Sequence, residues 1–296
     1  MRTIKVPATS ANLGPGFDCL GLALSPSDTF LIEPSDKDIL DNVEERFNNR
    51  DNLFLQAYRR GCEALHIQDH IHAVFQCGIP VSRGLGSSAA LIVAGLAAAS
   101  VLHDSALSRD DIFELASEME GHPDNAAPCM FGGLTACLKK DDGSYLFRKM
   151  KTAENLFFTA LIPDVEESTE QARSILPKQY SKEDTAACIS HGILMVEALN
   201  RGDLDLMKEA SKDRIHEPYR STLIPHYTDV RNICTAENNV LLISGSGSTL
   251  LCIGLEPLSR DAENEIRKLP ENWKIRKLRP AGGAEVQENG LWHPII

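Results

Sequence analysis

The sequence lacks the features of several large classes of protein. Its longest apolar stretch, residues 89–99, is interrupted by Gly95 and is too short to span a bilayer. The first residues form no apolar signal segment. Positive charge is scarce, because 30 Lys and Arg stand against 42 Asp and Glu, a net charge of −12. With no basic stripe among aromatic residues, we expect neither nucleic acid nor a membrane as a partner.

Cysteine pairs at metal-binding or redox spacing are also missing. The eight cysteines are scattered without a Cys-x-x-Cys pair, and the histidines form no His-Glu-x-x-His motif of a helical zinc site. This pattern indicates neither a zinc site nor a disulfide framework. Scattered free cysteines are typical of a reducing compartment, so we expect a cytoplasmic location.

Hydrophobic periodicity predicts a protein with both helices and strands. The 296 residues, 43% hydrophobic and 24% charged, are typical of a globular protein with two domains. Alternating apolar residues predict strands around residues 4–6, 20–24, 30–32, 71–75, 156–162, 240–244 and 249–254. Helices are predicted at residues 51–65 with Asp51 as cap, 87–101, 108–120 with Ser108 as cap, 185–199, 204–212 and 259–269. A charged hairpin at residues 139–151 marks the boundary between expected domains of residues 1–153 and 154–296.

The most informative stretch is IPVSRGLGSSAA at residues 79–90, where glycines and hydroxyls directly precede an apolar helix. Gly84 and Gly86 let the backbone approach a ligand closely. Ser87 and Ser88 begin the helix, whose free N–H groups and positive dipole end attract an anion. A glycine turn with one capping serine is the simpler explanation, but Arg83 and the second hydroxyl exceed what a cap needs. The stretch therefore predicts a phosphate-binding loop.

The type of phosphate loop is narrowed by what is absent. A P-loop needs Gly-Lys, a dipeptide that the chain does not contain, and the motifs of protein kinases are missing. Residues 84–89 do satisfy a relaxed dinucleotide fingerprint. The acidic residue expected about twenty positions later would be Asp110 or Asp111, which lie at a predicted helix start. A dinucleotide-binding oxidoreductase is thus a minor alternative.

Five further segments carry polar residues that could bind or react, although each also has a simpler explanation as a turn, a cap or a surface residue. They are PATSANLGPGFD at residues 7–18, EMEGHPDN at 118–125, STEQAR at 168–173, HEPYR at 216–220 and SGSGST at 244–249.

Together these segments resemble the GHMP kinase superfamily and, within it, the homoserine kinases. VPATSANLGPGFDCLGLAL at residues 6–24 is similar to the N-terminal signature of homoserine kinases, and residues 80–90 are similar to the superfamily loop PxxxGLGSSAA. Residues 120–128 and 217–220 also resemble segments of that family. The resemblance implies an α+β fold with two domains. An N-terminal ATP-binding domain with a mixed sheet and a ferredoxin-like C-terminal domain would hold the site between them.

The resemblance implies a kinase that transfers the γ-phosphoryl group of ATP to the side-chain hydroxyl of L-homoserine, in threonine biosynthesis. It implies Mg2+ as a cofactor, held by Glu120 with a hydroxyl of Ser87 or Ser88. The implied ATP-binding residues are Asn52, Pro80, Val81, Ser82, Arg83, Gly84, Leu85, Gly86, Ser87, Ser88, Ala89, Ala90 and Thr169.

Homoserine is a zwitterion with one hydroxyl, so its site needs a carboxylate for the ammonium and arginines for the carboxylate. The resemblance places Asp18 on the ammonium, and Arg173 and Arg220 on the carboxylate. It places three further residues near the hydroxyl: Asn12, His122 and Asn125. The expected catalytic residues are Asp18, Asn125 and Arg173, with Asp18 orienting the substrate, because a loose phosphoryl transition state does not require a general base.

One motif departs from the superfamily pattern. The third motif usually reads SGAGPT, whereas residues 244–249 read SGSGST. Loss of the proline removes the restriction on φ at Ser248 and predicts a looser turn. This departure keeps a second hypothesis open, a non-catalytic relative that only binds its ligands. The resemblance also implies a homodimer.

Overall fold

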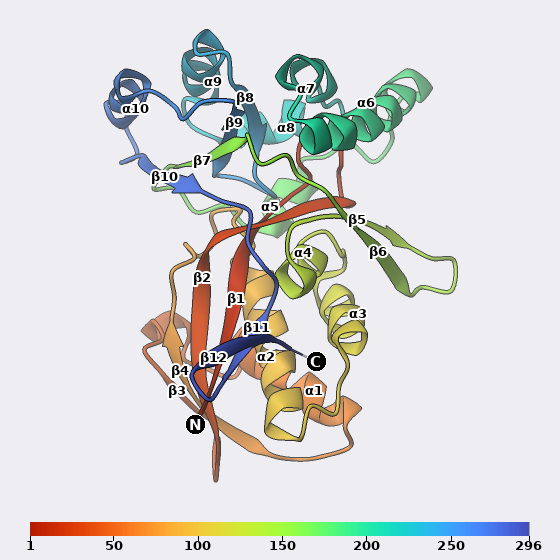
Figure 1. Ribbon diagram of the computed structural model, residues 1–296, viewed down its shortest axis with the longest axis vertical. Helices are drawn as coiled ribbons and strands as arrows, with labels where there is room; N and C mark the ends of the chain where they lie inside the picture. The colour runs from red at the N-terminus through yellow and green to blue at the C-terminus, as the bar shows by residue number, and fades with distance from the viewer. Residues whose placement is uncertain (296) are drawn as a thin grey trace.

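Two β-sheets with helices packed beside them make up the computed structural model, which describes residues 1–295 (Figure 1). The larger sheet occupies the lower half of Figure 1 and the smaller sheet the upper half. Among residues 1–295, no helix combines the length and the hydropathy that crossing a bilayer requires.

The larger sheet has eight strands in the order β12-β11-β1-β2-β4-β3, with β5 joined to β2 and β6 joined to β5. Its β3–β4 pair is parallel and its β1–β2 pair is antiparallel, so the sheet is mixed, as expected. The strands are β1 (Arg2–Ala11), β2 (Leu20–Ser35), β3 (Ile39–Asp41), β4 (His70–Gln76), β5 (Leu134–Lys139), β6 (Tyr145–Met150), β11 (Glu285–Glu288) and β12 (Leu291–Pro294).

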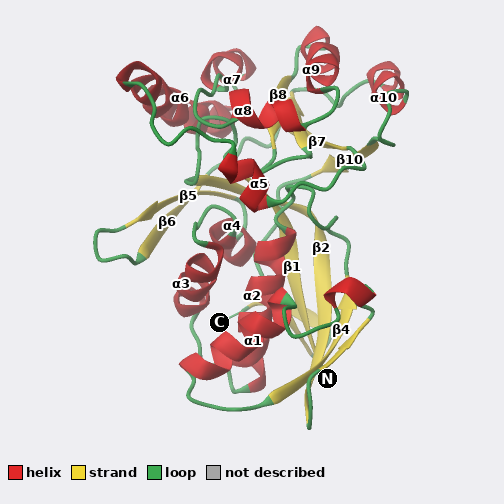
Figure 2. Cartoon of the chain, turned by 180° about the vertical axis from the view of Figure 1, so that it is seen from behind, coloured by secondary structure: helices red, strands yellow, loops and turns green. Residues whose placement is uncertain are grey.

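Four helices pack beside this sheet, as the reverse view in Figure 2 shows: α1 (Leu53–Ala64), α2 (Ser87–Leu102), α3 (Arg109–Glu120) and α4 (Ala126–Phe131). Helix α2 is buried almost all round, as its apolar sequence predicts. It crosses α1 closely, because a Cβ at Gly95 would lie 2.2 Å from the Phe54 carbonyl oxygen. The two helices therefore pack backbone to backbone at this point.

The caps of two helices were predicted, and one prediction is wrong. Ser108 caps α3 and forms a capping box with Asp111, as expected from the acidic first turn. Helix α1 is capped by Asn52 rather than by Asp51, and the Asn52 side chain accepts from the N–H groups of Phe54 and Leu55. Asn and Asp are equally good caps, so the sequence alone could not choose between adjacent positions.

The smaller sheet has four antiparallel strands in the order β10-β7-β9-β8. They are β7 (Phe157–Ile162), β8 (Val240–Ile243), β9 (Leu250–Gly254) and β10 (Lys274–Leu278). The helices of this half are α5 (Thr169–Ser174), α6 (Lys182–Arg201), α7 (Leu204–Ala210), α8 (Glu217–Arg220), α9 (Tyr227–Ala236) and α10 (Arg260–Arg267), with short 3-10 turns at Glu45–Phe47 and Ser221–Leu223. Helices follow β7 and β9, so the connectivity and the strand order are those of a ferredoxin-like domain.

The end of the chain returns to the larger sheet. Strand β11 pairs with β1, with Val286 opposite Ile4, and β12 pairs with β11. The predicted division at residues 153 and 154 therefore has one exception, since residues 285–294 lie in the sheet of the first half. Periodicity could not show this, because short strands such as β11 and β12 carry too few residues for a clear alternation.

Candidate active site

A cavity of about 520 Å³ lies where loops from both halves of the chain meet. From the first half it is lined by the segment after β1, the glycine loop before α2 and the segment after α3. From the second half it is lined by residues 167–169, Arg173, Arg220 and residues 245–246. Each of the five further polar segments singled out in the sequence thus contributes residues to the lining of one cavity.

The glycine loop lines this cavity through Val81, Ser82, Arg83, Gly84, Gly86, Ser87 and Ser88. Helix α2 begins at Ser87, and its N-cap residue Gly86 has a left-handed backbone. The free N–H groups at the start of this 16-residue helix therefore lie at the cavity wall. Leu85, Ala89 and Ala90 are fully buried beneath the loop, so their side chains support it. Pro80 does not line the cavity.

Close packing explains the two glycines of this loop. Gly84 has φ of +74°, and a Cβ on it would lie 2.3 Å from the Ser244 carbonyl oxygen. Gly86 has φ of +69°, and its Cβ would lie 1.8 Å from Thr9 Oγ1. The Ser244 hydroxyl also donates to the Gly84 carbonyl at 2.6 Å. The 244–249 segment, despite its missing proline, therefore packs directly on the glycine loop.

Arg83 pairs with acidic residues of the second half. Its guanidinium donates to Asp164 Oδ1 at 3.1 Å and lies 3.7 Å from Glu166 Oε1. Glu166 also accepts two hydrogen bonds from Arg46. The sequence left the partner of Arg83 open, and the structure shows an ion pair between the two halves.

Glu120 and Ser88 lie side by side, as the resemblance implies. The Ser88 hydroxyl donates to Glu120 Oε1. Burial raises the pKa of Glu120 above its usual range, against the opposing effects of the Ser88 hydrogen bond and the His122 charge. Ser87 also lines the cavity and is mostly buried. A hydroxyl and a half-buried carboxylate thus meet at the N-terminus of α2.

A histidine–aspartate pair lies next to this carboxylate. His122 Nδ1 is 2.5 Å from Asp124 Oδ1, and Asp124 is 1% exposed. Burial lowers the pKa of His122, but the hydrogen bond and charge of Asp124, together with the charge of Glu120, outweigh it and raise this pKa above its ordinary value. Potential ligand atoms of Asp18, His122 and Asp124 all lie within 4.8 Å of one another.

The amide side chains of Asn125 and Asn12 are held by neighbouring loops. Asn125 Oδ1 accepts from the Thr9 hydroxyl at 2.7 Å, which leaves its Nδ2 group for another partner. Asn12 donates to the Gly245 carbonyl at 2.8 Å and accepts from the Asp18 N–H at 3.1 Å. Asn12 therefore joins the segment after β1 to the second half, and its amide keeps one N–H and one lone pair for a further partner.

Asp18 and Arg173 form an ion pair with each other across the cavity. Both carboxylate oxygens of Asp18 accept from the Arg173 guanidinium, at 2.6 and 3.1 Å. Arg173 also lies over the Phe17 ring, 5.5 Å from its centroid. Two residues that the sequence assigned to opposite ends of the substrate are thus brought together.

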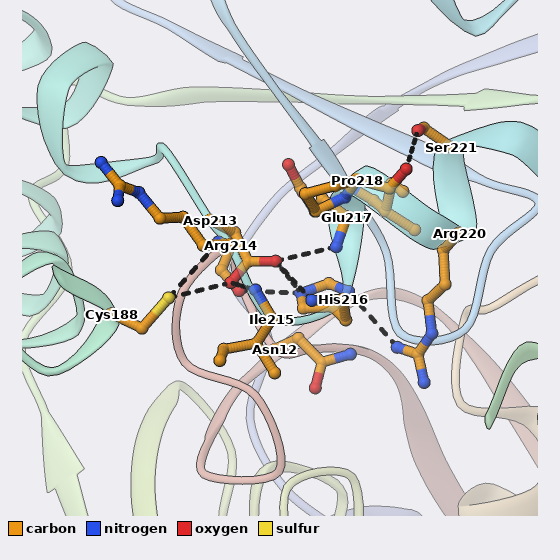
Figure 3. A network of polar contacts seen from close by, with 12 residues as sticks. Asn12, Cys188, Asp213, Arg214, Ile215, His216, Glu217, Pro218, Arg220 and Ser221 are labelled. Atoms are coloured by element: carbon orange, nitrogen blue, oxygen red, sulfur yellow. Dashed lines mark hydrogen bonds and ion pairs between the residues drawn. The ribbon is translucent and has the colours of Figure 1, made fainter. Parts of the chain in front are cut away.

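Arg220 is buried, although a surface position was its simplest explanation (Figure 3). It is 1% exposed and lines the cavity. Its guanidinium donates to the carbonyls of Ala172 at 3.2 Å and Gly245 at 2.9 Å. Among the described residues it forms no ion pair with a carboxylate. Burial lowers its pKa to about 10, and the charge of Arg173 contributes.

Asn52 and Thr169 both line this cavity. The Asn52 side chain caps α1 and donates to the Phe47 carbonyl at 3.0 Å, so its polar atoms already have partners. Thr169 is exposed at the first turn of α5, which Ser168 caps.

Two comparisons with known proteins agree on the family. Family models described as GHMP kinases N terminal domain and GHMP kinases C terminal match residues 52–133 and 195–275. Homoserine kinase from Clostridium botulinum strain Langeland is 37% identical over 285 residues, covering 94% of this chain and 96% of the relative. The chain belongs to the homoserine kinase family of GHMP kinases.

Solved structures of homoserine kinases superpose over nearly the whole chain. The homoserine kinase from Cytophaga hutchinsonii has a TM-score of 0.84 at 29% identity and covers 97% of both chains. A putative homoserine kinase from Listeria monocytogenes has a TM-score of 0.80 at 28% identity, covering 98% of this chain and all of that one. The predicted two-domain α+β fold of the GHMP kinases is confirmed.

Some residues of this GHMP kinase site were not singled out in the sequence. Thr9, Asp124 and Phe17 all lie inside quoted motifs but received no role. Glu167 lines the cavity with a buried carboxylate oxygen that has no hydrogen-bond partner in the part of the chain that the structure describes. The signal for the first three was their position between assigned residues, whereas nothing in the sequence indicates that Glu167 is buried.

Proposed function

We propose that this chain phosphorylates the side-chain hydroxyl of L-homoserine with ATP. The observation that carries the proposal is Arg220, a buried guanidinium in the cavity wall that forms no ion pair with a carboxylate of residues 1–295. A buried cation is costly unless it is paired. An amino-acid carboxylate bound in the cavity supplies that partner, beside the Asp18 carboxylate that suits an ammonium group.

Substrate binding then replaces the ion pair between Asp18 and Arg173. The ammonium group binds Asp18, and the carboxylate binds Arg220 and Arg173 through charge-assisted hydrogen bonds. Asn125 presents its Nδ2 group to the substrate hydroxyl, because Thr9 occupies its oxygen. His122 lies close to the same place, held by Asp124.

ATP binding rests on the glycine loop. Residues 81–84 and 86–88 line the cavity at the N-terminus of α2, where N–H groups and the helix dipole favour phosphate. Asn52 lines the same cavity, and Thr169 is proposed to lie beside the phosphates.

The residues around Glu120 fit Mg2+, which prefers oxygen ligands and binds through few protein side chains. Glu120 offers a carboxylate and Ser88 a hydroxyl in contact with it, and Ser87 offers a second hydroxyl nearby in sequence. When bound, the ion would neutralise phosphate charge in the transition state. Glu120, Ser88 and Ser87 would orient it against the glycine loop.

The reaction needs alignment more than a base. A loose phosphoryl transition state leaves the proton on the nucleophile until late. The chain's residues therefore bind both ends of the amino acid and direct its hydroxyl toward the γ-phosphate. Asp18 acts in this scheme as an orienting group.

A substrate panel tests the proposal. The purified chain is supplied with ATP and Mg2+ and with homoserine, mevalonate, galactose or shikimate in turn, and ADP release is measured. We expect ADP to be released only when homoserine is the alcohol supplied. Reaction with another alcohol contradicts the substrate, and binding of ATP and homoserine without turnover favours the non-catalytic relative. Omission of Mg2+ is expected to abolish release of ADP.

The cytoplasmic location and the homodimer stay predictions. All eight cysteines are free thiols.

A further inference from the structure

A buried polar network centred on His216 is not used by any of the roles above (Figure 3). The His216 side chain has no exposed surface and lies between the segment after β1 and α8. Its Nε2 is 2.8 Å from the Gly14 carbonyl oxygen, and its Nδ1 is 3.4 Å from Arg220 Nη1. Its ring stacks on Phe17 with 5.4 Å between centroids.

The partners of the ring decide where its hydrogen lies. A carbonyl oxygen only accepts, so Nε2 carries the hydrogen, and a guanidinium only donates, so Nδ1 keeps its lone pair. His216 is therefore the neutral Nε2–H tautomer. Burial lowers its pKa, which outweighs the opposing charge of Asp213.

The backbone that carries His216 is held by a second buried group. The Asp213 carboxylate accepts from the N–H groups of Ile215, His216 and Glu217, at 3.1, 2.7 and 2.8 Å. Asp213 has no exposed side-chain surface. Asp213 thus fixes the backbone from which the ring projects, and the ring cannot turn away from Arg220 without breaking its own bond to the Gly14 carbonyl.

We propose that His216 is a positioning residue that sets Arg220 against the segment after β1. This inference rests on the proposed role of Arg220 in binding the substrate carboxylate. Arg220 comes from the second half, whereas Gly14 and Asp18 come from the first. His216 contacts Gly14 of the first half and Arg220 of the second. It therefore sets the distance between Asp18, which is proposed to bind the ammonium group, and Arg220, which is proposed to bind the carboxylate.

The proposal predicts an effect on one substrate only. Apart from Asp213 of its own turn, the described partners of His216 are Gly14, Phe17 and Arg220, and none of them belongs to the glycine loop that is proposed to bind ATP. Loss of the ring should therefore weaken homoserine binding and leave ATP binding unchanged. A general loosening of the fold would affect both substrates.

Three variants separate the two contacts of the ring. His216→Asn keeps an acceptor near the Nδ1 position and loses the donor to Gly14. His216→Gln keeps a donor near the Nε2 position and loses the acceptor for Arg220. His216→Phe loses both and keeps the stacking on Phe17. Tyr180→Phe is the matched control, because it removes one hydrogen bond to the Ile215 carbonyl of the same turn without touching Arg220.

The measurement is KM for homoserine and for ATP, with kcat, in each variant. We expect His216→Phe to raise KM for homoserine by about 10- to 100-fold, because the variant loses hydrogen bonds that include one to a charged group. KM for ATP should change by less than about twofold in the same variant. The Asn and Gln variants should lie between, and they decide the question if the Phe variant does not fold.

Equal increases in both KM values, an unchanged KM for homoserine in all three variants, or an equal increase in Tyr180→Phe would each overturn the proposal. Arg220→Lys distinguishes this failure from failure of the proposed site. If Arg220→Lys raises KM for homoserine and the His216 variants do not, only the positioning role is wrong. If none of them changes it, the proposed site itself is wrong.

Discussion

At the scale of single residues, the site depends on charges whose partners change when substrate binds. Asp18 and Arg173 neutralise each other, and Arg220 is held by two carbonyl oxygens and by Nδ1 of His216. Each of these side chains lies in the cavity and none is a fully solvated surface group. Substitutions here should therefore act on substrate binding before they act on folding.

Asp18→Asn tests whether Asp18 orients the substrate. The amide keeps the shape of the side chain and loses the charge that attracts the ammonium group. We expect KM for homoserine to rise by about 10- to 100-fold, from the loss of a charge-assisted interaction, with kcat nearly unchanged. Steady-state kinetics measure both, with Asp164→Asn as the control that removes another carboxylate–arginine pair between the halves. A collapse of kcat alone would indicate a general base.

Glu217 predicts a pH dependence of stability. Burial raises the pKa of this carboxyl from 4.5 to about 8, so the folded chain holds a proton that the unfolded chain releases. The free energy of unfolding therefore falls as pH rises from 4.5 to about 8. The stability that protonated Glu217 contributes is fully present only below pH 4.5. Glu217→Gln, which keeps the acceptor for the Ile243 N–H, should flatten this part of the profile.

Urea unfolding at a series of pH values measures this effect. The control is Glu265→Gln, since Glu265 is an exposed carboxylate of α10. A profile that is equally steep in wild type and Glu217→Gln contradicts the assignment. A change in the control of the same size would show that net charge, rather than burial, controls the stability.

At the scale of elements, the sequence predicted best those segments with a strong local pattern. The glycine loop with α2, the Ser108 cap of α3 and the turn between β5 and β6 all follow from caps, turns and periodicity. Short elements such as α8 and β11 were not predicted, because four residues carry no period. The burial of Arg220 was missed for a related reason: it depends on contacts to Ala172 and Gly245, 48 and 25 residues away.

Gly86→Ala tests the packing of the glycine loop on β1. The new Cβ would lie 1.8 Å from Thr9 Oγ1 in a backbone with φ of +69°, so the loop has to move. We expect a lower melting temperature and a raised KM for ATP. Gly143→Ala is the control, because its φ is +89° and nothing lies within 4 Å. It carries only the left-handed backbone strain of about 1–2 kcal/mol, and equal effects on KM in both variants would contradict the packing argument.

At the scale of the whole molecule, contacts distant in sequence hold the two halves together. Family resemblance predicted the division into domains and the cavity between them, but local pattern could not place β11 on β1. Arg83 with Asp164, and Asn12 with Gly245, likewise join segments more than 80 residues apart. Such pairings depend on the folded arrangement and leave no periodic trace in the sequence.

Val286→Asp tests whether the C-terminal strands stabilise the first half. Val286 is 6% exposed and lies opposite Ile4, so the variant places a charge in the core without a partner. We expect the free energy of unfolding to fall by about 3 kcal/mol. Leu291→Asp is the control on β12, where the side chain is 65% exposed, and chemical denaturation measures both. Equal losses would show that β11 is not held as the structure has it.

The ion pair between Asp18 and Arg173 has a consequence for selectivity. In the proposed scheme, homoserine binding is an exchange of counterions: the free site already pairs its own acid with its own base, and a ligand must replace both partners at once. An amine that takes Asp18 leaves Arg173 without a counterion, whereas a simple alcohol supplies no charge, and a carboxylic acid bound to Arg220 leaves the pair closed. The internal salt bridge thus competes most strongly with the ligands that are least like an amino acid.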